Sequence, residues 1–434
     1  MTNTPSITVV IPTRDRAETL PFTIASCLTA ADDGVDILVI DNHNDDATQQ
    51  VLKGFGKRVR TIRAPQRLPM AKNWELALGH ISSEFVIYIG DDDALLPGSI
   101  KTFREINQRF PESTVTWRHL IYYWPNFPLK SRAGLVSLTW SDLVEVREGE
   151  RAVHRALAQV SAWSELPMIY NSFFKSSVIE RFLAGHGSPF FRSTSPDIYS
   201  GFLCALLEDS YVWSGRPLSI GGLSAGSTGA TLFRTTEQGP AERFDRENQE
   251  GGLRFSQSLD NIRLIPMIVT EAFLQAREAI NGMGTERITV DVAELVGSCF
   301  EQLLSVPNSD FDRLAAEMVA FSDRYGLRDY ALRLKAEVIC ARNMSSETRV
   351  ALEMFDPRKP TLIFDSRRAA VYDVAGVARL VQDLLDRPIL AAKIMSHPRW
   401  LIACAASYRR VLRERRNRGP IQLDLRPTDP RPKL

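Results

Sequence analysis

Four short apolar runs are spaced through the first ninety positions of this chain of 434 residues, and amphipathic segments separate them. The runs lie at Ile7–Ile11, Ile37–Ile40, Val59–Arg63 and Phe85–Ile89, and the third is the most polar. Strands that are apolar along their whole length are typical of a parallel sheet that helices cover on both faces. The alternation of strand and helix therefore predicts an α/β fold with a mostly parallel sheet.

The rest of the chain has a different pattern. Short helices and strands mix up to about residue 236, and amphipathic helix dominates after residue 253. A polar segment with glycines lies between these parts and is typical of a linker. We predict four segments: an α/β domain over 1–236 with halves at 1–110 and 111–236, a linker over 237–252, a mainly α-helical C-terminal domain over 253–419, and a flexible tail over 420–434.

Composition narrows the class of protein. The 53 Lys and Arg against 52 Asp and Glu give a formal charge of +1, which argues against a chain that coats nucleic acid. The five cysteines are scattered without metal-ligand spacing, as expected of free thiols in a reducing compartment. Neither a signal peptide nor an apolar run of roughly 18 residues is visible. We therefore expect a cytoplasmic protein without transmembrane helices.

Six arginines lie close together between Arg409 and Arg418, around Val411 and Leu412. A basic amphipathic helix of this kind attracts anionic lipid headgroups, so the segment predicts peripheral contact with the inner face of a membrane. The alternative is a solvated helix end, where arginine is favoured near the negative pole of the helix. Both interpretations stay open.

The most distinctive local feature is Gly90-Asp91-Asp92-Asp93, which follows directly on the strand that ends at Ile89. Ligands of open α/β sheets bind at the carboxyl ends of the strands. Three adjacent carboxylates repel each other unless a cation lies among them, and Mg²⁺ binds carboxylates together with substrate phosphates. The triplet therefore predicts a divalent metal site, although an acidic turn before the helix near Pro97 is an alternative.

Two further strand ends carry polar residues. Pro12–Arg16 follows the first strand and is partly basic, which suits a phosphate or a base edge. Asp41 ends the second strand, where its carboxylate could accept hydrogen bonds from a nucleobase or ribose, whereas Asp45 is expected to be a helix N-cap. Neither GxGxxG after the first strand nor GxxxxGK[ST] anywhere is present, so the dinucleotide-binding and P-loop fingerprints are missing.

Four motifs occur together in an order and spacing that resemble the inverting glycosyltransferases of family 2, which have the GT-A fold. They are ITVVIPTRDR at 7–16, ILVIDNHNDDAT at 37–48, AKNWELAL at 71–78 and FVIYIGDDDALLP at 85–97. The resemblance covers about the first 110 residues well and the stretch to about 235 loosely. It implies transfer of a sugar from a nucleotide-diphosphate sugar, with a UDP-sugar as the expected donor, and a divalent metal cofactor, Mn²⁺ or Mg²⁺.

The resemblance also implies residue roles at the donor. The nucleotide-binding residues would be Pro12, Thr13, Arg14, Asp41, Lys72, Asp91 and Asp92, and the metal ligands would be Asp93 and Asp91. Lys72 stands where the family usually has arginine, and lysine does not reproduce a bidentate arginine contact. Gly90 stands where the family often has aspartate, so which two of the three carboxylates act stays open.

An inverting transfer needs a base for the acceptor hydroxyl. The family places this base at or near a helix start in the second half of the domain, and Asp197 in Ser195-Pro196-Asp197 matches that position. The alternatives are Glu208 and Asp209 at the other end of the same helix, and a role for Asp197 in capping alone. We choose Asp197 as the catalytic base.

Two other segments have two interpretations each. The segment Gly221–Ala230 is expected to be a loop, either plain or able to close over the donor phosphates or the acceptor. The aromatic segment Trp117–Trp124 would stack on an acceptor sugar or pack in the core, and the same two interpretations apply to Trp163 and Tyr170.

Processive synthases that resemble this family carry a QxxRW motif and transmembrane helices. Here Arg399-Trp400 is preceded by Ser396 instead of glutamine, so we predict a non-processive enzyme that extends a polysaccharide, lipid-linked glycan or protein glycan. The rival hypotheses are a sugar-nucleotide transferase and a non-catalytic scaffold that binds a sugar nucleotide or glycan. The helical region would bind the acceptor, a membrane or a second subunit of a homo-oligomer.

Overall fold

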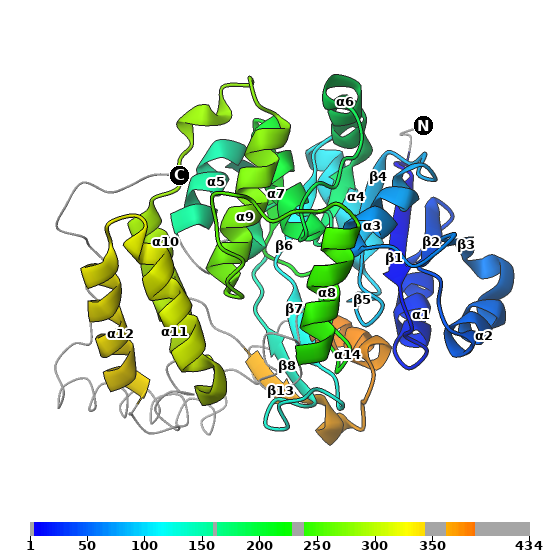
Figure 1. Ribbon diagram of the computed structural model, residues 1–434. Coiled ribbons are helices and arrows are strands. Elements are labelled where there is room, and N and C mark those ends of the chain that lie inside the picture. The colour runs from blue at the N-terminus through cyan, green and yellow to red at the C-terminus, as the bar shows by residue number, and fades with distance from the viewer. Residues whose placement is uncertain (1–3, 159–162, 228–237, 343–361, 387–434) are drawn as a thin grey trace.

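The computed structural model describes residues 4–158, 163–227, 238–342 and 362–386 (Figure 1). Its centre is an eight-stranded sheet in the order β3-β2-β1-β4-β10-β6-β11-β9. The strands are β1 (Ile7–Thr13), β2 (Val35–Asp41), β3 (Arg60–Arg63), β4 (Phe85–Tyr88), β6 (Val115–Trp117), β9 (Val144–Glu148), β10 (Ser172–Lys175) and β11 (Ser210–Ser214).

The first four strands of the sheet are parallel, as the apolar runs predict. Strand β1 lies between β2 and β4, and its register pairs Thr13 with Asp41, so the two strand ends lie side by side. The helices of this half are α1 (Leu20–Ala30), α2 (Asp46–Phe55), α3 (Met70–Leu78) and α4 (Ser99–Arg109). Asp45 is the N-cap of α2 and accepts a hydrogen bond from the Thr48 amide at 2.8 Å, as expected. The predicted α/β class is confirmed.

A second sheet of five strands begins next to the aspartate triplet, in the order β13-β8-β7-β12-β5. Its strands are β5 (Ala94–Leu95), β7 (Leu120–Tyr123), β8 (Leu135–Leu138), β12 (Ser219–Leu223) and β13 (Leu362–Asp365). Because β12 pairs with β5, the second half of the α/β region is brought directly against the end of β4. This pairing brings β12 against the aspartate triplet.

The glycine-rich segment was expected to be a loop from Gly221 onward, and that prediction is wrong at its start. Strand β12 continues through Gly221 and Gly222 to Leu223, in parallel pairing with β7. A Cβ atom at Gly222 would lie 1.8 Å from the Asp92 carbonyl oxygen. Glycine is present here because the strand passes against backbone, which periodicity cannot reveal.

The second half and the C-terminal region are mainly helical. The α-helices are α5 (Gly149–Ala158), α6 (Ser176–His186), α7 (Pro196–Leu207), α8 (Gln238–Glu250), α9 (Ile265–Ala279), α10 (Val292–Leu303), α11 (Asn308–Asp323), α12 (Arg328–Arg342) and α14 (Val374–Asp386). Short 3₁₀ helices lie at η1 (Gly56–Arg58), η2 (Trp163–Glu165), η4 (Thr285–Arg287) and η5 (Ser366–Ala369). The mainly helical C-terminal region is therefore confirmed.

One apolar cluster extends from the sheet into these helices. It includes Val10 of β1, Phe202 of α7, Phe273 of α9 and Val338 of α12. The rings of Phe202 and Phe273 are 5.4 Å apart, and Figure 1 shows α9 beside α7, with α10–α12 at the opposite end of the molecule from β2 and β3. The helices therefore share a core with the α/β region.

Two segments bear on the predicted domain boundaries, which stay a prediction. Most of the expected linker forms α8, and residues 362–386 return to the second sheet through β13 and to the α/β region through α14. Gln382 Oε1 accepts a hydrogen bond from the Gly98 amide at 3.0 Å. The tail over 420–434 and the arginines between Arg409 and Arg418 lie outside the described residues.

Within the described ranges, no helix combines the length and the apolar character that crossing a bilayer requires.

Candidate active site

The aspartate triplet lies buried at the end of β4, with 8% of Asp91, 5% of Asp92 and 2% of Asp93 exposed. Asp91 faces the end of β1: the Arg14 amide donates to its Oδ2 at 3.3 Å, and Arg16 Nε lies 3.4 Å from its Oδ1. Because β1 and β4 are parallel neighbours, the basic residues after β1 meet the acidic residues after β4.

Asp92 points toward the segment after β12. The Ser224 hydroxyl donates to its Oδ2 at 2.6 Å, and the Ser227 hydroxyl donates to the same oxygen. Its backbone carbonyl accepts a hydrogen bond from Trp124 Nε1 at 2.9 Å. The glycine- and serine-rich segment therefore covers this carboxylate.

Asp93 is turned into the protein. The Gly222 amide donates to its Oδ1 at 2.6 Å, the Gly90 amide donates to its Oδ2 at 2.7 Å, and the Tyr170 hydroxyl also donates to Oδ2. These bonds join β4, β12 and the segment before β10. Asp93 therefore holds three parts of the chain together.

The triplet carries more negative charge than its surroundings balance. Burial, together with the Asp92 carboxylate, raises the pKa of Asp93 to about 8. Burial raises the pKa of Asp91 to about 6, although the Arg16 guanidinium opposes this shift. A site of this kind favours binding of a further cation.

A divalent metal fits part of this arrangement. Both Asp93 oxygens already accept hydrogen bonds, so its contacts give no support to the predicted role as a ligand. Within the described ranges, Oδ1 of Asp92 accepts no hydrogen bond, and Oδ1 of Asp91 lies 3.4 Å from Arg16 Nε. No group of three metal-ligating side chains occurs among the described residues, but Mg²⁺ commonly takes one or two carboxylates plus phosphates.

The other predicted donor residues are arranged around the same edge. Arg14 Nη1 forms an ion pair at 2.8 Å with Glu247 of α8, which lies over this end of the sheet. Pro12 and Thr13 end β1 beside Asp41. Lys72 is an exposed residue of α3. The structure therefore brings Pro12, Thr13 and Arg14 to the triplet and leaves Lys72 on the surface of the adjacent helix.

Asp41 is buried, with 1% exposed, and its carboxylate is already engaged. The Asn44 amide donates to Oδ1 at 2.7 Å, and Arg63 Nη1 lies 3.1 Å from Oδ2. Gln49 also donates to Oδ2. In this arrangement Asp41 orders the end of β2, and contact with a nucleobase would require Gln49 or Arg63 to move.

Asp197 lies in the first turn of α7, as the helix-start argument predicts. It is half-buried, and burial raises its pKa above the ordinary value of aspartate. Within the described part of the chain it forms no ion pair, so no cation opposes that shift. A carboxylate with a raised pKa is a stronger base than an ordinary one.

Neither the contact of Tyr170 with Asp93 nor the place of His119 beside it was predicted from the sequence. Tyr170 donates to Asp93, and its burial, together with the charges of Asp93, Asp92 and Asp197, raises its pKa well above the ordinary value. His119 Nε2 lies 3.1 Å from the Tyr170 carbonyl oxygen, and burial lowers the pKa of His119 to about 4. A single tyrosine and a single histidine in irregular segments carry no periodic signal that could have marked them.

The alternative base residues lie at the far end of α7. Glu208 follows the last residue of the helix and pairs with Arg181, whereas Asp209 is exposed. Glu208 lies eleven positions after Asp197, which corresponds to roughly 16 Å along the helix axis. Of the three candidate bases, Asp197 is the one whose charge acts on Tyr170.

The aromatic segment Trp117–Trp124 mainly packs in the core. Trp117 and Tyr122 are fully buried, and Trp117 Nε1 donates to the Ser219 hydroxyl at 2.8 Å. Trp124 is 5% exposed. Core packing therefore accounts for these side chains.

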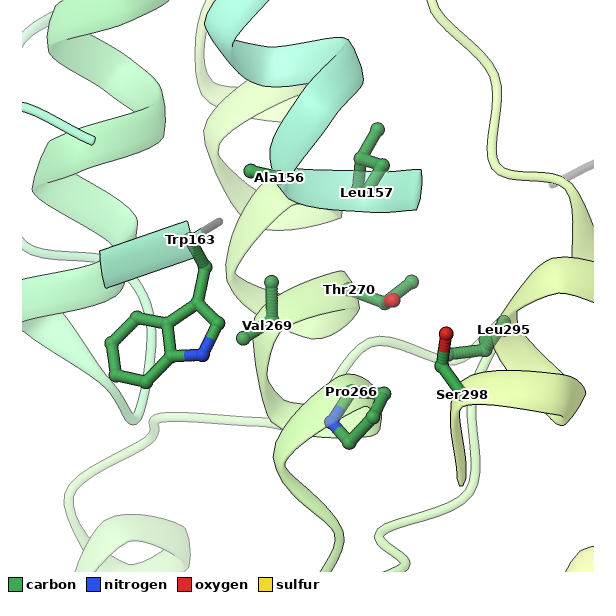
Figure 2. Close-up of a pocket in the computed structure, with 8 residues that line it drawn as sticks. All are labelled: Ala156, Leu157, Trp163, Pro266, Val269, Thr270, Leu295 and Ser298. Atoms are coloured by element: carbon green, nitrogen blue, oxygen red, sulfur yellow. The ribbon is translucent and has the colours of Figure 1, made fainter. Parts of the chain in front are cut away.

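A cavity away from the triplet does not resemble a reaction site. Figure 2 shows that residues of α5, α9 and α10 line it, together with Trp163 of η2. Its polar side chains other than Trp163 are Thr270 and Ser298. No titratable side chain lines it, so it offers no acid or base.

The close approach at Gly222 makes a direct prediction. We expect Gly222→Ala to lower the free energy of unfolding by about 2 kcal/mol, because a Cβ would overlap the Asp92 carbonyl oxygen. Gly54→Ala is the control, since nothing lies within 4 Å of a Cβ there, in α2. Thermal denaturation of both variants measures the difference. Equal melting temperatures would contradict the close approach.

The sequence of residues 8–134 matches the model of glycosyl transferase family 2. No protein of curated function matches the chain.

Solved structures that resemble the chain include TarS 1-349 of S. aureus in complex with UDP-GlcNAc, with 13% identity, a TM-score of 0.38, and coverage of 78% of this chain and 89% of that chain. Another is the mannosyltransferase PcManGT from Pyrobaculum calidifontis in complex with GDP-Man and Mn2+, with 14% identity, a TM-score of 0.39, and coverage of 89% of both chains. Likeness of this low degree carries no argument about the ligands of this chain. The sequence match therefore makes residues 8–134 similar to glycosyl transferase family 2, within a chain that has an α/β fold.

Proposed function

We propose that this protein transfers a sugar from a nucleotide-diphosphate sugar to an acceptor hydroxyl, with inversion at the anomeric carbon. The proposal depends on one observation: Tyr170 interacts both with the aspartate triplet and with the start of α7. This tyrosine donates to Asp93 and lies close enough to Asp197 for the two to interact electrostatically, although Asp93 and Asp197 are far apart in the sequence. A single displacement requires a base and a donor-binding carboxylate cluster close to each other.

The residues divide the reaction between them. Asp197 takes the proton of the acceptor hydroxyl as its oxygen bonds to the anomeric carbon and the bond from that carbon to the diphosphate oxygen breaks. Thr13, Arg14 and Arg16 line the diphosphate side at the end of β1. Asp91 and Asp92 would hold a divalent metal, which when bound stabilises the negative charge of the leaving diphosphate.

We expect the acceptor to be a polysaccharide, a lipid-linked glycan or a protein glycan, and the transfer to be non-processive. A UDP-sugar is the first donor to test. Arg14 and Asp92 are held by protein groups in this structure, so donor binding would exchange these contacts for phosphate and metal contacts.

A nucleotide screen tests this function. Calorimetry or thermal shift with UDP, GDP, dTDP and CMP, each with and without Mn²⁺, should reveal metal-dependent binding of one diphosphate. The matching sugar nucleotides should then release that diphosphate in the presence of the protein. Binding without any release would favour a non-catalytic sugar-nucleotide module, and no binding to folded protein would contradict the proposed donor site.

The pH dependence of the reaction follows from the raised pKa of Asp197. A base acts only when it is deprotonated, so kcat/KM should be full above that pKa and fall as the pH drops through it. The fall should lie above about pH 4, the ordinary range of aspartate. A pH profile of nucleoside diphosphate release measures it. Activity that stays constant down to pH 4 would contradict Asp197 as the base.

A further inference from the structure

Glu271 of α9 is a completely buried carboxylate for which the reaction above has no use. Its side chain is 0% exposed, and its Oε2 accepts a hydrogen bond from the Ser193 hydroxyl at 2.7 Å. The described residues provide no cation paired with it, and burial raises its pKa to about 7. Burying a carboxylate costs more free energy than burying an apolar side chain of similar size, so its presence calls for a reason.

Ser193 connects this carboxylate to the start of α7. The Ser193 hydroxyl donates to Glu271 and accepts a hydrogen bond from the Ser195 amide at 3.1 Å. Ser195 is the N-cap of α7, yet its own side chain makes no capping bond, and its carbonyl accepts from the Tyr199 amide. The first turn of α7, which carries Asp197, is therefore anchored through Ser193.

The segment before α7 is held at its other end by a second carboxylate. Glu75 of α3 accepts hydrogen bonds from the Phe190 amide at 2.9 Å and the Phe191 amide at 3.0 Å. Phe191 packs edge-on against Trp74, whose ring stacks on Tyr170. Glu75 thus fixes the segment to the nucleotide half, and Glu271 fixes it to the helical region. Hydrogen bonds to carboxylates are stronger than those between neutral groups and suit this purpose.

We propose that Glu271 is a positioning residue for the reaction: through the Ser193 hydroxyl it holds the first turn of α7, so that the Asp197 carboxylate faces the acceptor hydroxyl. The inference rests on the proposed function, in which Asp197 is the base. It gives α9 of the C-terminal region a role in the reaction without contact with either substrate.

Three variants test the proposal: Glu271→Leu, Ser193→Ala and Glu271→Gln. The assay measures the release of nucleoside diphosphate from the sugar nucleotide that the screen identifies. The first two variants should lower kcat by about tenfold or more and leave the donor KM unchanged, because misplacement of a base slows only the chemical step. Glu271→Gln should retain most activity, since its amide oxygen still accepts from Ser193. The double variant Ser193→Ala with Glu271→Leu should be no slower than the slower single variant.

The matched control is Glu278→Leu, an exposed glutamate on the same helix, which should leave kcat unchanged. Wild-type kcat in Glu271→Leu, or additive losses in the double variant, would overturn the proposal. A fall in kcat of Glu271→Gln equal to that of Glu271→Leu would also overturn it, because the hydrogen bond would then not be the cause.

Hydrogen–deuterium exchange separates this inference from the proposed function. Glu271→Leu and Ser193→Ala should speed amide exchange at residues 193–199 and leave exchange of the first four strands unchanged. If the wild-type protein releases no nucleoside diphosphate from any donor, the proposed function fails, and exchange still decides whether Glu271 anchors this turn. Unchanged exchange at 193–199 overturns the anchoring whatever the activity.

Discussion

Asp197→Asn is expected to lower sugar transfer by about 100-fold or more while donor binding stays intact, because an amide cannot take the proton of the acceptor hydroxyl. Asparagine has nearly the same shape, and no described ion pair depends on the carboxylate. The first turn of α7 should therefore keep its structure. Single-turnover release of the nucleoside diphosphate measures the chemical step, and calorimetry with the bound diphosphate measures donor affinity.

Glu208→Gln is the matched control for this prediction. Glu208 lies at the other end of α7 and pairs with Arg181, so its loss should change the rate by no more than about twofold. Near-normal transfer in Asp197→Asn would show that another group is the base. A large loss in Glu208→Gln would then make Glu208 that group, in spite of its distance from Tyr170.

Asp92→Asn is expected to remove the effect of Mn²⁺ on donor binding, with a loss of affinity of about tenfold to 100-fold. The substitution halves the oxygen donors that Asp92 offers to a metal, but its remaining amide oxygen still accepts from Ser224 or Ser227. The melting temperature should therefore change little. Titration of the diphosphate with and without Mn²⁺ gives the result.

Asp93→Asn should behave differently from Asp92→Asn. Asp93 accepts hydrogen bonds at both oxygens, from Gly222, Gly90 and Tyr170, and an amide nitrogen cannot accept any of them. A buried donor without a partner costs about 1–3 kcal/mol, so this variant should lose stability first. If Asp93→Asn keeps its melting temperature and loses only the Mn²⁺ effect, Asp93 is the metal ligand, as the resemblance implies.

The nucleotide half could be predicted from sequence because its signals are local. Each buried parallel strand is an apolar run, the helices between them carry apolar stripes, and α2 also has a local N-cap at Asp45. Ligands bind where parallel strands end, so the polar residues after β1 and β4 could be expected to meet. The register of β1 between β2 and β4 confirms that they share one edge.

Other features depend on contacts between distant segments. The strand through Gly222 looks like a loop in the sequence, because a residue that must pass against the Asp92 carbonyl oxygen has no side chain to show a period. Tyr170 and Glu271 lie in segments without any motif, yet one contacts Asp93 and the other contacts Ser193. Such pairings arise only when β12, β10 and α9 have docked.

The sequence by itself determined the α/β class, the order of elements in the first hundred residues and the candidate residues Asp91–Asp93 and Asp197. Tertiary structure alone decided which oxygens of the triplet are used inside the protein, that Asp197 and not Glu208 reaches Tyr170, and that a helix of the C-terminal region anchors α7. The physical reason is the distance along the chain over which each kind of interaction acts. Periodicity and capping act over a few residues, whereas burial, charge and hydrogen-bond partners are set by whatever the fold brings into contact.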